Sequence, residues 1–255
     1  MIPNRVVIVT GAASGIGLAT AQLLADENWL VVSCDLQPAH ESIHKIANWK
    51  EHLLVDVRSV EHLEKLVDTA ATYGPIEALV NNAGVNHVAD ITDVSEEDWD
   101  RVLDTNLKAA FFASRYVVPY FRKQGKGSIV NIASNAGLLP RAHDPVYSIS
   151  KMSLVGLTKS LALCLSRDNI RVNCICPGPV CETGIIDDSL AAAADREAAA
   201  QSYINASPLA AAQGRMIHPK EVAANVSYLL SEAAAMVTGT SIAIDGGKSL
   251  GVPPK

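Results

Sequence analysis

The chain has 255 residues, of which 49% are hydrophobic and 19% are charged, and its formal net charge is −6. This length suits one large domain with a substantial core, and the composition excludes an intrinsically disordered protein. The acidic balance without a basic stretch argues against a nucleic-acid or anionic-membrane partner, and the lack of an apolar run of 18 or more residues argues against a membrane span.

A cytoplasmic protein is expected, because the first predicted strand begins almost at the initiator methionine and leaves no room for a signal peptide. The five cysteines are an odd number, which favours free thiols in a reducing compartment. Cys174 and Cys176 lie on one face of a predicted strand, but no further Cys or His follows at the spacing of a metal site. We therefore expect buried thiols and no metal.

The chain begins with a run of β-branched residues, a glycine-rich turn and an apolar helix. Residues 6–9 predict a buried parallel strand, and residues 18–25 have apolar side chains at helical spacing. Between them, Gly11, Gly15 and Gly17 allow a tight turn next to a helix N-terminus, which attracts anions. The segment predicts a phosphate-binding site. Its spacing differs from the general Gly-x-Gly-x-x-Gly fingerprint, and an ordinary strand–helix loop is the alternative.

Strands and helices alternate along the rest of the chain. Further strands are predicted over residues 29–35, 52–57, 78–82, 128–134, 170–175 and 240–245. Helices are predicted over residues 39–49, 60–73, 99–124, 146–166, 189–203 and 218–231. This order predicts a single α/β domain with a Rossmann-like, doubly wound sheet of seven parallel strands in three layers. Ligands bind such sheets at the carboxyl ends of the strands, so the residues that follow each strand are the candidates for function.

Asp35 ends the second predicted strand. A carboxylate at this position can accept hydrogen bonds from the adenosine ribose hydroxyls and would repel a 2′-phosphate. The glycine turn contains no Arg or Lys, and Leu36 and Gln37 follow the aspartate. These residues favour NAD over NADP as the cofactor. An aspartate that only caps a turn is the alternative.

Ser134, Tyr147 and Lys151 form the strongest candidate catalytic group. Ser134 ends the fifth predicted strand, and Tyr147 and Lys151 share one helix face at positions i and i+4. A tyrosine with its ordinary pKa of about 10 is a poor base at neutral pH. A nearby ammonium group lowers that pKa, and a serine hydroxyl can stabilise a substrate oxygen whose charge changes. A surface tyrosine and a solvated lysine are the alternative.

The motifs of this chain resemble those of the short-chain dehydrogenase/reductase family. In chain order they are Thr10-Gly11-x-x-x-Gly15-x-Gly17, Asp56, Asn81-Asn82-Ala83-Gly84, Asn106, Ser134, Tyr147-x-x-x-Lys151 and Pro177-Gly178. The resemblance covers about residues 5–247 and rests on all of these motifs together. It implies an oxidoreductase that passes a hydride between a nicotinamide and a carbinol carbon without a metal.

The resemblance also implies a role for each matched residue. Tyr147 would exchange the hydroxyl proton, and Lys151 would lower the pKa of Tyr147 and bind the nicotinamide ribose. Ser134 would orient the substrate carbonyl, and Asn106 would hold a water molecule in a proton relay to Lys151. The other cofactor contacts would come from Gly11, Ser14, Gly15, Ile16, Gly17, Asp35, Asp56, Val57, Asn82, Ala83, Gly84, Pro177, Gly178, Val180 and Thr183.

Four further features carry expectations. Residues 180–216 resemble the substrate lid of the family, and the long helices around Asn106 and Tyr147 imply a homotetramer by analogy. The loop before Tyr147 carries Arg141, His143 and Asp144, which either contact a polar or anionic substrate or are solvated loop residues. Two lid residues, Cys181 and Glu182, could line the pocket in the same way.

The sequence thus predicts an NAD-dependent dehydrogenase of a secondary alcohol, such as a sugar, a polyol or a cyclic diol. A 3-oxoacyl or other carbonyl reductase of the same family is the second hypothesis, although NADPH and basic residues near the glycine turn would be more natural for it. A non-catalytic NAD-sensing module is the third. The set of Asn106, Ser134, Tyr147 and Lys151 disfavours this module, because a protein that only binds NAD needs no proton relay.

Overall fold

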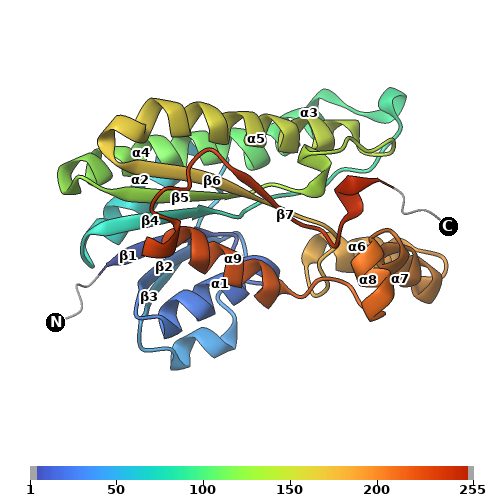
Figure 1. The fold of residues 1–255 in the computed structure, drawn as a ribbon, viewed down its shortest axis with the longest axis horizontal. Coiled ribbons are helices and arrows are strands. Elements are labelled where there is room, and N and C mark those ends of the chain that lie inside the picture. The colour runs from blue at the N-terminus through green and yellow to red at the C-terminus, as the bar shows by residue number, and fades with distance from the viewer. Residues whose placement is uncertain (1–4, 252–255) are drawn as a thin grey trace.

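The computed structural model describes residues 5–251, whose central feature is a sheet of seven parallel strands (Figure 1). The strands lie in the order β3-β2-β1-β4-β5-β6-β7, so the chain moves outward from β1 first in one direction and then in the other. The predicted doubly wound sheet of seven strands is confirmed. The strand bounds are Val6–Thr10 (β1), Leu30–Asp35 (β2), Trp49–Leu54 (β3), Ile76–Asn81 (β4), Gly127–Ile132 (β5), Ile170–Pro177 (β6) and Ser241–Ile244 (β7).

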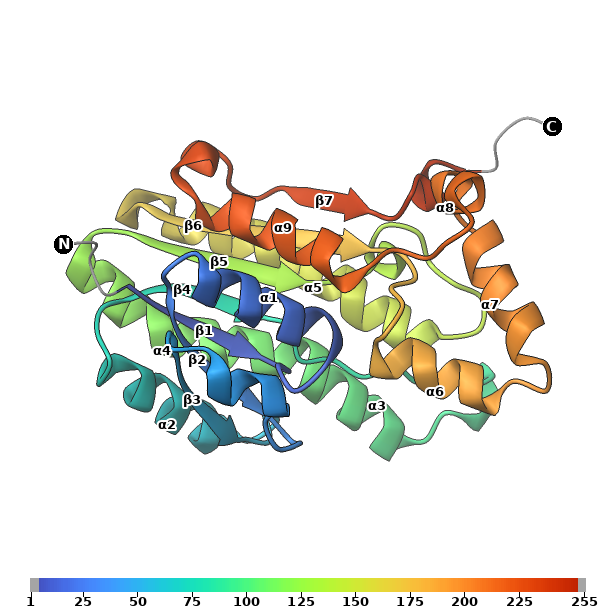
Figure 2. The ribbon, with the colours of Figure 1, turned by 90° about the horizontal axis from the view of Figure 1, so that it is seen from below.

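Helices cover both faces of the sheet, which explains the β-branched run in β1. Helices α1 (Gly15–Asp26) and α9 (Pro219–Leu230) pack together on one face, and α2 (Val60–Ala71) and α5 (Pro145–Leu165) lie on the other (Figure 2). Residues Val7 and Val9 of β1 belong to the core under the first pair, whereas Ile8 belongs to the opposite core. Every residue of β1 is therefore buried, as parallel strands between two helical layers require.

The prediction of a helix over residues 39–49 is wrong. Only Glu41–Lys45 forms a short 3₁₀ helix, and Trp49 already begins β3. The Trp49 side chain is buried, and its Nε1 donates a hydrogen bond of 2.8 Å to Ser33 Oγ of the neighbouring strand. Packing against β2 therefore outweighs the weak helical pattern of this segment and moves β3 toward the N-terminus relative to the predicted strand.

The long helix predicted over residues 99–124 is divided into two. Helix α3 (Glu96–Leu103) begins after Ser95, whose Oγ accepts a hydrogen bond of 3.1 Å from the Asp98 backbone N–H. Residues 104–108 form a π-helical turn that contains Asn106, and α4 (Ala109–Gln124) follows. Such turns inside helices are uncommon and occur often at functional sites.

Residues 180–216 form three helices instead of the one predicted over 189–203. They are α6 (Gly184–Ala192), α7 (Arg196–Asn205) and α8 (Pro208–Gln213), and they lie beyond the carboxyl ends of the strands (Figure 1). Ser189 Oγ and Tyr203 Oη are 2.6 Å apart and join α6 to α7. The role of residues 180–216 as a substrate lid stays a prediction.

Helix α5 is the one described helix that is long and apolar enough to cross a membrane by length and composition alone. It packs against β6 within the domain, and its buried face carries polar side chains such as Tyr147, Ser150 and Lys151. This pattern is typical of the core helix of a folded domain.

Candidate active site

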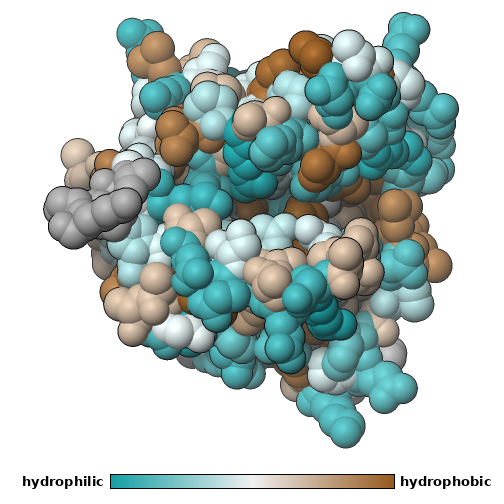
Figure 3. All heavy atoms as spheres, turned by 90° about the vertical axis from the view of Figure 1, so that its right-hand side faces the viewer, coloured by the Kyte–Doolittle hydropathy of each residue, from teal (hydrophilic) through white to brown (hydrophobic). Residues whose placement is uncertain are grey.

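A cavity of about 570 Å³ lies at the carboxyl ends of the central strands, next to the lid helices. Figure 3 views the molecule from this end, where the surface is hollowed. The predicted residues that line the cavity are Gly11, Ser14, Gly15, Ile16, Asp35, Val57, Asn82, Ala83, Gly84, Ser134, Tyr147, Lys151, Pro177, Gly178, Val180 and Thr183. Three other predicted residues, Gly17, Asp56 and Asn106, do not line it, and their positions explain why.

The glycine turn is held against β4 by a network that leaves no room for side chains. Gly11 has a φ of +65°, and a Cβ there would lie 2.7 Å from Ala83 Cα. A Cβ on Gly17 would overlap the carbonyl oxygen of Gly11, so Gly17 permits close packing within the turn and does not face the cavity. Asn82 Nδ2 donates hydrogen bonds to the carbonyl oxygens of Thr10 (2.9 Å) and Gly11 (2.8 Å). The turn is thereby fixed as a backbone cradle at the N-terminus of α1, which fits a pyrophosphate.

Asp35 lies beside the glycine turn and lines the cavity, as predicted. Its Oδ2 accepts a hydrogen bond of 3.0 Å from the Ala13 N–H, and its Oδ1 accepts one of 3.1 Å from the Gln37 N–H. These two bonds orient the carboxylate at the end of β2, next to the phosphate cradle. Leu36, which sequence reasoning did not assign to the site, also lines the cavity.

Asp56 pairs with Arg58 instead of facing the cavity. Its carboxylate accepts hydrogen bonds from Arg58 Nε (3.0 Å) and Nη2 (2.7 Å), and this pairing lowers the pKa of Asp56. Its neighbours Val55 and Val57 line the cavity wall. The apolar residues on each side of Asp56 are therefore the ones available to an adenine ring.

Ser134, Tyr147 and Lys151 converge at the inner wall of the cavity, and all three side chains are buried. Lys151 Nζ donates a hydrogen bond of 3.0 Å to the Ile132 carbonyl oxygen and lies 5.7 Å from the centre of the Tyr147 ring. Burial lowers the pKa of Lys151 to about 8. Burial raises the pKa of Tyr147, while the neighbouring Ser134 hydroxyl and Arg141 guanidinium oppose that rise.

Asn106 is buried behind this group and is already hydrogen-bonded. Its Oδ1 accepts from the Val85 N–H at 2.8 Å, and its Nδ2 donates to the Val85 carbonyl (2.9 Å) and to Ser150 Oγ (2.9 Å). A Cβ on Gly84 would lie 3.2 Å from both Asn106 Oδ1 and Lys151 Nζ, so the two side chains meet at Gly84. In this structure Asn106 anchors the loop after β4, and the water relay assigned to it stays a prediction.

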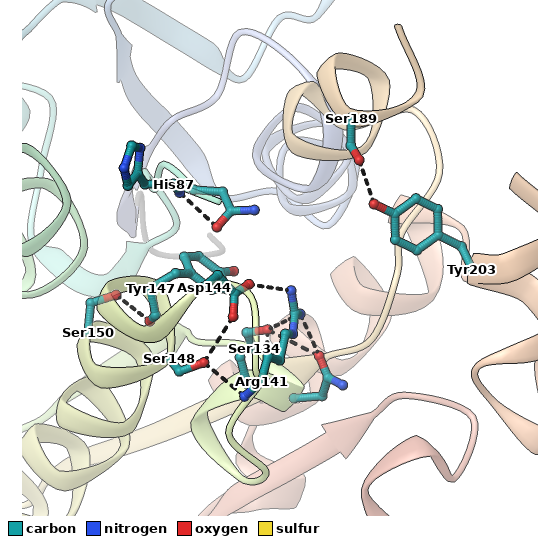
Figure 4. Close-up of polar contacts among 12 residues, drawn as sticks. His87, Ser134, Arg141, Asp144, Tyr147, Ser148, Ser150, Ser189 and Tyr203 are labelled. Carbon is teal, nitrogen blue, oxygen red and sulfur yellow. Dashed lines mark hydrogen bonds and ion pairs between the residues drawn. The ribbon is translucent and has the colours of Figure 1, made fainter. Parts of the chain in front are cut away.

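The loop before Tyr147 contributes an ordered cluster and not a solvated tip (Figure 4). Arg141 Nη1 forms an ion pair of 3.0 Å with the buried Asp144. Arg141 Nη2 donates to Asn135 Oδ1 at 2.9 Å and to Ser134 Oγ at 3.3 Å. Together with His143, both charged residues line the cavity. The cluster therefore reaches the predicted catalytic serine directly.

Cys181 and Glu182 do not belong to the cavity wall, whereas two further residues that sequence reasoning missed, besides Leu36, do. Cys181 and Glu182 are not among the lining residues, and Glu182 instead lies 3.7 Å from His218. Tyr203 from α7 and Lys248, which follows β7, do line the cavity. No motif marks these two positions, because Tyr203 lies in an alanine-rich segment and Lys248 lies just after residues 5–247, which carry the motif resemblance.

A doubly wound sheet with this cradle and this Ser-Tyr-Lys group defines a dinucleotide-dependent oxidoreductase. A family model described as enoyl-(acyl carrier protein) reductase matches residues 11–249. The 3-oxoacyl-[acyl-carrier-protein] reductase FabG of Thermotoga maritima is 36% identical over 96% of this chain and 98% of its own length.

A cyclopentanol dehydrogenase from a Comamonas strain is 35% identical, with 96% of this chain and 97% of that protein aligned. The structure of ligand-free aldohexose dehydrogenase from Thermoplasma acidophilum matches with a TM-score of 0.89 and 31% identity, over 99% of this chain and 97% of that one. The protein belongs to the short-chain dehydrogenase/reductase family, whose members use a nicotinamide cofactor.

Proposed function

We propose that this protein is an NAD-dependent dehydrogenase that oxidises a secondary alcohol to a ketone. The observation that carries the proposal is the buried convergence of Ser134, Tyr147 and Lys151 at the inner wall of the cavity. A serine hydroxyl, a phenol and an ammonium group in one pocket can hydrogen-bond a substrate oxygen and accept its proton. A site that only binds a cofactor does not need this combination of groups.

In the proposed reaction, the bound nicotinamide supplies the acceptor for the hydride of the carbinol carbon. Ser134 Oγ donates a hydrogen bond to the substrate oxygen and orients it. Tyr147 Oη takes the hydroxyl proton, and the Lys151 ammonium stabilises the phenolate that this step requires. Because the pKa of Lys151 is about 8, the ammonium form predominates at neutral pH.

The preference for NAD is supported by the chemistry of the cradle. The Asp35 carboxylate is oriented by the Ala13 and Gln37 N–H groups and would repel a 2′-phosphate. The turn between Gly11 and Gly15 has no cationic side chain that could bind such a phosphate. We expect kcat/KM to be at least about 100-fold higher with NAD than with NADP, since one unfavourable charge contact costs a few kcal/mol. Equal use of both cofactors would contradict this assignment.

The direct test of the function is an NAD-coupled screen of secondary alcohols, sugars, polyols and cyclic diols, with Tyr147→Phe as the matched variant. We expect the wild-type protein to form NADH with at least one class, and Tyr147→Phe to lose turnover while it still binds NAD. A variant that keeps its activity would exclude Tyr147 as the proton acceptor.

A 3-oxoacyl reductase is the second candidate, and the 36% identity to FabG of Thermotoga maritima favours it. Efficient reduction of an acetoacetyl thioester with NADPH, and not with NADH, would establish this candidate against the first. An NAD-sensing module would instead bind NAD tightly and turn over none of these substrates.

We further propose a cytoplasmic homotetramer that forms through the outer faces of α3, α4 and α5. Large apolar side chains are exposed on these helices, namely Trp99, Phe111, Ile149, Met152 and Leu163. Exposed large apolar side chains on neighbouring helices are a feature of many protein interfaces. Sedimentation equilibrium should give four times the chain mass, and a monomer at micromolar concentration would contradict the proposal.

A further inference from the structure

The end of the cavity beyond Ser134 has more cationic than anionic groups. Apart from Lys151, its charged lining consists of Arg141 and Lys248 against one carboxylate, Asp144, with His143 beside them. The other carboxylate among the described lining residues, Asp35, lies at the glycine turn. Apart from Lys151, the lining at this end of the cavity therefore carries one excess positive charge.

Arg141 is a fixed cation. Its two ion-pair and hydrogen-bond partners, Asp144 and Asn135, hold the guanidinium beside Ser134 Oγ (Figure 4). Its Nε is buried and has no hydrogen-bond partner in the part of the chain that the structure describes. A cation held in this way loses little conformational freedom when it meets an anion, which favours binding.

Lys248 is a cation that forms no direct ion pair among the described residues, although Asp245 and Asp144 lie near enough to act on its charge. It lies at the start of a short 3₁₀ helix after β7, in a turn that Asp245 stabilises by accepting hydrogen bonds from the Gly247 (2.9 Å) and Ser249 (2.8 Å) N–H groups. Those bonds occupy the Asp245 carboxylate, and no ion pair of Lys248 occurs among the described residues. Burial and the charge of Arg141 lower the pKa of Lys248, while the charges of Asp245 and Asp144 partly oppose that shift. An incoming anion would relieve this unfavourable environment.

Resting on the proposed dehydrogenase function, we propose that the substrate is a hydroxy acid whose carboxylate is bound by Lys248 and Arg141. Counting Lys151 and the buried Asp245 as well, three cations and two carboxylates leave a net charge of one around this end of the cavity, which matches a singly charged carboxylate better than a doubly charged phosphate. Arg141 Nη2 lies 3.3 Å from Ser134 Oγ, so the carboxylate and the carbinol oxygen must be only a few bonds apart. This geometry favours short 2- or 3-hydroxy acids, and the product is the corresponding keto acid.

The test compares kcat/KM for 2- and 3-hydroxybutyrate with their methyl esters, and includes glycerol 3-phosphate as a phosphate-bearing secondary alcohol. We expect kcat/KM to be about tenfold or more higher for the acids than for the esters, because one charged hydrogen bond contributes that much binding free energy. Esters that react as well as the acids, or a preference for the phosphate, would overturn the carboxylate site while leaving the dehydrogenase function intact. Absence of turnover with every secondary alcohol would refute the dehydrogenase function itself.

Lys248→Met separates binding of the carboxylate from a structural role. We expect its kcat/KM to fall about 10- to 100-fold with the acids, mainly through KM, and to stay unchanged with the esters. Lys248→Arg should restore most of the loss, and Lys220→Met, at an exposed site on α9, is the matched control. An equal loss with acids and esters would overturn the proposal.

A binding measurement tests the site independently of turnover. Butyrate, which has the carboxylate but no carbinol, should bind the wild-type protein in the presence of NADH when followed by calorimetry. Lys248→Met should weaken butyrate binding by the same factor by which it raises KM for the acid substrates. Butyrate binding that does not depend on Lys248 would contradict the assignment.

Discussion

Replacing Lys151 by methionine should abolish turnover and yet stabilise the folded protein at neutral pH. The Lys151 side chain is buried at the cavity wall near Tyr147, and burial lowers its pKa from the ordinary 10.5 to about 8. A pKa lowered in the folded state means that the unfolded chain binds the proton more tightly. The buried ammonium therefore opposes folding at neutral pH, and this cost is lost as the pH rises from about 8 to 10.5.

The size of the effect follows from that difference in pKa. A change from 10.5 to about 8 corresponds to about 3 kcal/mol of unfavourable free energy at neutral pH. Methionine removes this cost but leaves the Ile132 carbonyl without the hydrogen bond from Nζ. The loss of that hydrogen bond reduces the gain in stability by about 1 kcal/mol. Lys151→Met should therefore be more stable than the wild-type protein by about 2 kcal/mol at about pH 7.

The assay is urea denaturation of both proteins without cofactor, at one fixed chain concentration, at about pH 7 and about pH 10. The gain in stability of Lys151→Met should shrink by about 2 kcal/mol at the higher pH, because wild-type Lys151 is then largely neutral. Lys220→Met, at an exposed site, should show neither the gain nor the pH dependence. A Lys151→Met protein that is less stable at both pH values would refute the argument that burial destabilises the ammonium.

Two other substitutions test the elements that position the site. Gly17→Ala should reduce NAD affinity by about 100-fold and destabilise the fold by about 1–3 kcal/mol, because the added Cβ would overlap the Gly11 carbonyl oxygen. NAD affinity is measured by calorimetry. Wild-type affinity in Gly17→Ala would show that the turn is not as tightly packed as described. Trp49→Phe should cost about 1 kcal/mol in urea denaturation through loss of the hydrogen bond to Ser33, with kcat unchanged. If Trp49→Phe were as stable as the wild type, the hydrogen bond to Ser33 would not explain why β3 begins at Trp49.

The predictable parts of the fold are those in which the spacing of apolar residues along a short segment shows which side chains are buried. The β1 run of β-branched residues alternates between two cores, so its sequence alone indicates a strand covered on both faces. Trp49 shows the limit of such patterns, because its place in β3 depends on a contact with Ser33 from another strand. The alanine-rich segment of residues 180–216 shows another limit. Helix α7 has no buried residues, so no spacing of apolar side chains could indicate where it begins and ends.

The candidate site divides in the same way. Ser134, Tyr147 and Lys151 were predictable because strand ends and helical spacing determine where they meet. Whether Asp56 faces the cavity or Arg58 depends on side-chain pairing, which chain position does not specify. Lys248 joins Arg141 at the cavity only because β7 closes the sheet beside β6, a long-range arrangement that no short motif encodes.

The most direct test of the central claim is hydride transfer itself. With a substrate found in the alcohol screen and deuterated at its carbinol carbon, mass spectrometry of the reduced cofactor measures where that deuterium goes. We predict that the label appears in the NADH formed by the wild-type protein, and that Tyr147→Phe transfers none above background. Ketone formation without label in the cofactor, or transfer by Tyr147→Phe at the wild-type rate, would contradict the account.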